Sequence, residues 1–73
     1  MVNEQKADEI YDKVKDRLKG QEGQIVAIEV DSGDFFVGKN TIEAYDLAHR
    51  KHPHKQFFFK RVGAKAAYFV GVL

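Results

Sequence analysis

The chain has 73 residues, with twelve Lys or Arg, eleven Asp or Glu and no cysteine, which gives a net charge of +1. This length predicts a single domain spanning residues 1–73, and the lack of cysteine excludes disulfides and thiolate metal sites. No apolar run approaches the ~20 residues of a membrane span, and the N-terminus is polar, so we expect a cytoplasmic protein without membrane contact.

Charge is unevenly divided along the chain. Residues 1–46 hold all eleven acids and six bases, whereas residues 47–73 hold six bases and no acid, so the two parts carry −5 and +6. These opposite charges either attract each other within one fold or form a basic surface for an anionic partner.

An amphipathic pattern predicts a first helix over about residues 4–19. Its apolar positions recur at helical spacing: Ala7, Ile10, Tyr11, Val14 and Leu18. Asn3 is the expected N-cap, and Gly20 suits the left-handed residue that closes a helix.

A β-hairpin is predicted next. Residues 23–30, GQIVAIEV, alternate so that Val26, Ile28 and Val30 share one side of a strand, and FFVG at 35–38 returns as the second strand. Residues 31–34, DSGD, form the turn, where glycine accepts a positive φ.

A second helix is predicted over about residues 41–52. Asn40 is its N-cap, Glu43 completes a capping-box pattern, and Pro53 marks the end. Residues 55–62, KQFFFKRV, and 65–71, KAAYFVG, then predict two more strands joined by a tight turn.

The expected fold is therefore α+β in the order α-β-β-α-β-β. We expect a four-stranded, mainly antiparallel sheet with strand order 2-1-3-4 and both helices on one face. In the second hairpin, a loop at 63–64 places Phe59 opposite Tyr68 and Phe58 opposite Phe69.

One-sided helical cover would leave large apolar side chains on the other face of the sheet. The side chains concerned are Ile25, Phe36, Phe58 and Phe69. Such a patch favours a protein interface, most simply a homodimer or a contact with a small partner protein. The other interpretation is that the fourth strand or the C-terminal residues fold over these side chains.

A nucleic-acid-binding module is the alternative function. The strand QFFFKRV interleaves aromatic and basic residues, as in sheets on which unpaired bases stack. The basic residues of this site would be Lys60, Arg61 and Lys65. The strand lacks the glycines of a ribonucleoprotein motif, which weakens the hypothesis.

The three histidines lie close together in HRKHPHK, residues 49–55. His49 and His52 have a spacing at which imidazoles bind zinc or nickel, but the surrounding bases oppose a dication. Helix-terminal packing of His52 as a half-buried aromatic is the simpler interpretation. Ser32 is the only serine and has no motif around it, so we expect neither an enzyme nor a cofactor or metal.

Several segments resemble a group of short, uncharacterised prokaryotic proteins. They are IVAIEVDSGDFFVG, EAYDLAHRKHP and FFFKRVG, and the resemblance spans roughly residues 22–65. The matching positions are Val26, Ala27, Ile28, Gly33, Gly38, Glu43, Ala44, Ala48, Pro53, Val62 and Gly63. His52 stands where the similar proteins often have tyrosine. The resemblance implies no activity or functional residues, and it hints at an antitoxin-like or accessory partner role.

Overall fold

The computed structural model describes residues 4–63 and 69–70 of the chain. The elements, in chain order, are α1 (Glu4–Val14), the 3-10 helix η1 (Lys15–Leu18), β1 (Ile25–Glu29), β2 (Asp34–Gly38), α2 (Thr41–Lys51), β3 (Phe58–Arg61) and β4 (Phe69–Val70). Within this part of the chain, no helix is long and apolar enough to cross a membrane. The expected Asn3 cap lies outside the described residues.

The sheet is antiparallel throughout, in the order β2-β1-β3-β4. β1 is the central strand, and Ile28 lies opposite Phe35 of β2 and Phe58 of β3. Within the described residues, β1, β2 and β3 have four or five residues each, and β4 comprises two residues on the outer side of β3.

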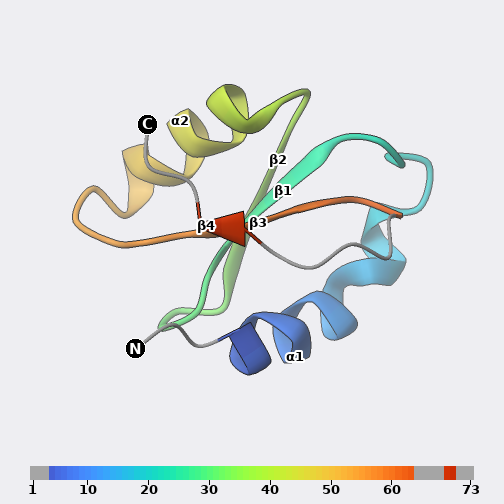
Figure 1. Cartoon of the computed structure of the whole chain (residues 1–73), viewed down its shortest axis with the longest axis horizontal. Coiled ribbons are helices and arrows are strands. Elements are labelled where there is room, and N and C mark those ends of the chain that lie inside the picture. The colour runs from blue at the N-terminus through green and yellow to red at the C-terminus, as the bar shows by residue number, and fades with distance from the viewer. Residues whose placement is uncertain (1–3, 64–68, 71–73) are drawn as a thin grey trace.

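The two helices lie on opposite faces of this sheet, with the strands between them (Figure 1). α1 packs on Val26, Ile28 and Phe58, whereas α2 packs on residues of the other parity in β1 and β3. Since side chains alternate along a strand, these two sets point to opposite sides. All five residues of β1 are consequently buried.

The apolar core is thus divided by the sheet into two clusters. The α1 side comprises Ala7, Ile10, Val14, Leu18, Val26, Ile28, Phe58 and Val62. The α2 side comprises Ile25, Ala27, Ala44, Ala48, Phe57 and Phe59. α2 contributes only alanines to the fully buried part of its cluster, so its backbone approaches the sheet closely.

The expected fold, a four-stranded sheet with both helices on one face, is therefore wrong. The sheet has three full strands, and it is covered on both faces. The register of the last pair also differs by one residue, because Phe59 lies opposite Phe69 and Phe58 opposite Val70. The order of the strands is the expected one.

Local signals placed the second helix correctly. The Asn40 side chain accepts a hydrogen bond of 2.8 Å from the Glu43 N–H, and the Glu43 carboxylate accepts one of 2.8 Å from the Lys39 N–H. α2 ends at Lys51, just before His52 and Pro53. The first helix is shorter than expected, because its last turn tightens into η1.

α2 approaches the sheet closely at Gly38, the last residue of β2. A methyl carbon at this position would lie 2.5 Å from the Ala44 backbone nitrogen. The neighbouring atoms are backbone, which cannot move aside as a flexible side chain can. Gly38 is therefore required for α2 to lie against this face.

We predict that Gly38→Ala lowers the free energy of unfolding by about 1–3 kcal/mol, because the added methyl group overpacks the α2 contact. Gly33→Asn is the control. Gly33 has a φ of 80° and open space around it, and asparagine tolerates this conformation. Urea unfolding at a fixed protein concentration measures both. A Gly38 variant as stable as the Gly33 variant contradicts the prediction.

Candidate interface at the sheet edge

The four residues predicted to form an interface do not form one patch. Ile25 and Phe58 are 4% and 6% exposed and lie in separate core clusters on opposite faces. Phe36 is half-buried at the edge of the α2-side cluster. Phe69 lies opposite Phe59, and its side chain falls outside the description. The exposed face on which that interface depended is covered by a helix.

β2 is the outer strand of the sheet, and among the described residues it pairs only with β1. The Val62 N–H donates to the Gln24 carbonyl, whereas the Glu29 carbonyl accepts from the Gly33 N–H in the turn that leads to β2. Backbone groups of successive residues alternate in direction along a strand. The N–H and C=O groups of residues 25, 27 and 29 therefore point to β2. Their partners in β2 are residues 38, 36 and 34, so the N–H and C=O groups of Phe35 and Val37 point to the open edge.

Apolar side chains flank this edge on both faces. Phe35 and Val37 pack against the α1-side cluster, and Phe36 packs against the α2-side cluster, yet all three remain half-buried rather than buried. A separate groove of about 260 Å³ lies between α1 and the β1–β2 turn, with Ile10 and Val30 in its lining. Among the described residues, the edge thus combines backbone groups without a strand partner with partly uncovered apolar surface.

One flank of α2 runs alongside β2. Lys51 lies 3.3 Å from the Asp34 carboxylate at the first residue of β2, and Glu43 accepts from the Lys39 N–H just after its last residue. Leu47 lies midway between them on the same flank, since residues four apart lie one above the other on a helix. Its side chain is 40% exposed.

Asp34 connects the end of α2 to the edge strand. Its Oδ2 atom lies 2.8 Å from His52 Nε2, and the His52 ring meets Phe36 edge-on with ring centroids 6.1 Å apart. The hydrogen bond from His52 lowers the pKa of the Asp34 carboxyl, partial burial opposes it, and the Lys51 contact lowers the pKa further. The predicted half-buried packing of His52 is confirmed.

Glu29 is a buried carboxylate that sequence reasoning missed. It is 2% exposed and accepts hydrogen bonds from the Asp31 and Ser32 N–H groups at 3.1 and 2.9 Å. Burial is the largest influence on the pKa of Glu29 and raises it, but bonds from the Ser32 side chain and the two backbones outweigh burial and lower it. Glu29 therefore shapes the turn that leads into β2, so its role is structural.

Of the basic residues in the nucleic-acid hypothesis, the structure describes Lys60 and Arg61. Lys60 is 8% exposed, and its Nζ atom lies 4.6 Å from the centre of the Tyr11 ring. The Arg61 guanidinium donates to the Gly23 carbonyl at 2.7 Å. Lys65 lies outside the described residues. Both described basic side chains contact groups of their own chain, and the nucleic-acid hypothesis stays a prediction.

The three histidines have different surroundings. His49 stacks on Tyr45 with ring centroids 5.2 Å apart, His52 contacts Asp34, and His54 is exposed. Within residues 4–63 and 69–70, no group of three or more His, Asp or Glu side chains is placed to hold a metal ion. Ser32 accepts from the Asp34 N–H inside the turn.

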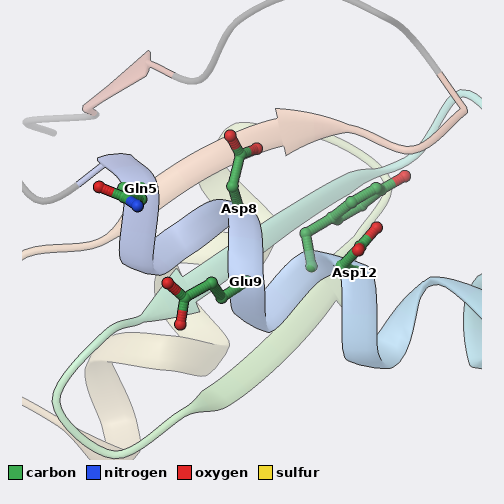
Figure 2. A pocket seen from close by; sticks show the side chains of 5 residues that line it. Gln5, Asp8, Glu9 and Asp12 are labelled. Carbon is green, nitrogen blue, oxygen red and sulfur yellow. The ribbon is translucent and has the colours of Figure 1, made fainter.

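A shallow depression of about 360 Å³ lies on α1, lined by Gln5, Asp8, Glu9, Tyr11 and Asp12. In Figure 2 the carboxylates of Asp8, Glu9 and Asp12 extend in different directions from the helix. Because they do not converge on one point, these acids form a solvated helix surface rather than a cation site. The edge of β2 is therefore the candidate site that the described residues support best.

Comparisons with protein-family models, curated proteins and solved structures find no match to this chain. The resemblance to short prokaryotic proteins stays a prediction. The role of the β2 edge is accordingly inferred from its geometry and chemistry alone.

We predict that Asp34→Asn flattens the acid dependence of stability. The pKa of Asp34 is lower in the folded chain than its usual value of about 3.9, so its contribution is complete above that pH and is lost as pH falls through the folded pKa. The wild type should lose more unfolding free energy than the variant as pH drops below about 4. Urea unfolding across this range measures the slopes, and parallel slopes contradict the prediction.

Proposed function

We propose that this chain is a non-enzymatic protein-interaction module that associates through the open edge of β2, with a second copy as its simplest partner. One observation carries the proposal. The outward backbone groups of Phe35 and Val37 lie between half-buried apolar side chains on both faces of the sheet. An edge of this kind is a template for another strand.

Within the described residues, the interior of β2 carries none of the proline, bulge or charge that commonly protects an edge strand. Natural edges are blunted by proline, by bulges or by charged side chains along the strand. From residue 35 to residue 38 the sequence is FFVG, without charge or proline, and its pairing with β1 is continuous. The charged residues stand only at the ends, at Asp34 and Lys39.

A second copy fits this edge because β2 can pair with itself antiparallel about a two-fold axis. Residues opposite each other in an antiparallel pair have side chains on the same face of the sheet. The axis must therefore lie midway between one residue and the same residue of the copy. An axis at Phe36 places Phe35 opposite Val37 of the copy, and both belong to the α1 face. The outward groups of these residues then exchange hydrogen bonds, and the sheet becomes continuous across two chains.

The interface draws on two modest contributions. Each hydrogen bond contributes a net of about 0.5–1.5 kcal/mol, and apolar area contributes about 25 cal/mol per Å². Symmetry doubles every contact. Small domains also bury a limited fraction of their surface, so association adds cover that a 73-residue chain lacks.

We predict that Val37→Pro weakens association, since proline removes an outward donor and places its ring against the partner strand. The dissociation constant should rise at least about tenfold, because the loss counts twice in a symmetric dimer. Sedimentation velocity across micromolar concentrations measures the change. The bonds to β1 use the other residues of β2, so the monomer should stay folded.

Val37→Thr is the matched control. Threonine keeps the β-branched shape and the backbone N–H, so this variant should associate like the wild type within a small factor. Thermal melting followed by circular dichroism checks the fold of both variants. A wild-type chain that sediments as a monomer at all concentrations refutes the proposal, and so does a Val37→Pro variant that associates unchanged.

A further inference from the structure

We infer that α2 forms the second half of the interface, by packing antiparallel against α2 of the second copy through Glu43, Leu47 and Lys51. This inference rests on the proposed pairing of β2 and specifies which other surface meets the partner. The three residues are four apart, so they form one stripe along the helix. We refer to them as the α2 stripe.

The contacts of the α2 stripe place it over the open edge rather than over the centre of the sheet. Its acidic end contacts the Lys39 N–H after the end of β2, and its basic end contacts Asp34 at the start of β2. The stripe therefore runs antiparallel to β2 and spans the same length of edge. A two-fold axis through Phe36 consequently passes near the middle of the stripe.

The charges of the α2 stripe are complementary to a second copy of itself. Glu43 and Lys51 lie eight residues apart, about 12 Å along the helix, with Leu47 at the midpoint. A two-fold axis reverses the direction of the helix, so Glu43 of one copy meets Lys51 of the other, twice. Leu47 meets its own counterpart. A like-charged stripe would repel itself at this position, whereas this one attracts.

The exposed apolar side chains of α2 provide a control for the α2 stripe. The described residues contain two exposed large apolar side chains, Leu47 at 40% and Ile42 at 69%. Ile42 lies on the other flank with Tyr45, which packs edge-on against Phe57 before β3. The inference therefore requires Leu47, and not the more exposed Ile42, to be covered on association.

The test uses two charge reversals. Glu43→Lys creates two Lys–Lys contacts in a homodimer, and Lys51→Glu creates two Glu–Glu contacts. Each variant alone should dimerise at least about tenfold more weakly than the wild type, because like charges placed opposite each other oppose association. In an equimolar mixture, both contacts are again between opposite charges. The mixture should therefore recover the dimer mass as a heterodimer.

Size-exclusion chromatography with light scattering measures each variant and the mixture. Recovery in the mixture separates a contact between chains from damage within one chain, since each variant carries its own defect into the mixture unchanged. Asp46→Lys and Arg50→Glu are the controls. They reverse charges of a pair on the outer surface of α2, joined at 2.9 Å, and their mixture should behave like either variant alone.

The outcomes distinguish this inference from the proposed function. A wild-type chain that stays monomeric overturns both. If Val37→Pro dissociates the wild-type dimer but the charge reversals leave it unchanged, the β2 pairing is retained and the α2 contact is overturned. Weakened single variants whose mixture stays weak also overturn it. If Ile42→Glu weakens the dimer more than Leu47→Glu does, the inference that the Leu47 flank of α2 meets the partner is overturned.

Discussion

The structure depends on one constraint, the burial of the central strand β1 on both of its faces. Val26 and Ile28 lie under α1, whereas Ile25 and Ala27 lie under α2, and β2 and β3 occupy the two edges of the strand. Burial on both faces requires the helices to approach the sheet closely, and small side chains permit that approach. Gly38 and the alanines of α2 bring that helix against the sheet. Neither face of the central strand is then available to a partner.

Because both faces of the sheet are covered, a partner can reach the sheet only at its edge. Each helix covers only part of the sheet, so the β2 side chains are half-buried where those of β1 are buried. The edge is also held firmly in position. Glu29 orders the turn that leads into β2, and Asp34 connects the strand to Lys51 and His52 at the end of α2. A partner strand would therefore meet a preorganised template.

The misplacement of Phe58 has one physical cause, the register between β3 and β1. Two hairpins taken separately do not reveal which of their faces coincide, because that depends on how β3 pairs with β1. The pairing of Ile28 with Phe58 places that phenylalanine on the α1 face, so it cannot join Ile25 and Phe36. A shift of one residue in register reverses every side chain. The unbroken apolar run IVAI in β1 is the sequence signal for a strand buried on both faces.

The sequence by itself determined the features that depend on neighbouring residues. Helical periodicity placed α1, the Asn40 and Glu43 pair placed the start of α2, and glycine at 33 placed the hairpin turn, because caps, turns and periodicity act over a few residues. The tertiary structure alone decided which face each helix covers and that Glu29 and Lys60 are buried. Those outcomes depend on contacts between residues distant in the chain, whose energies no local pattern contains.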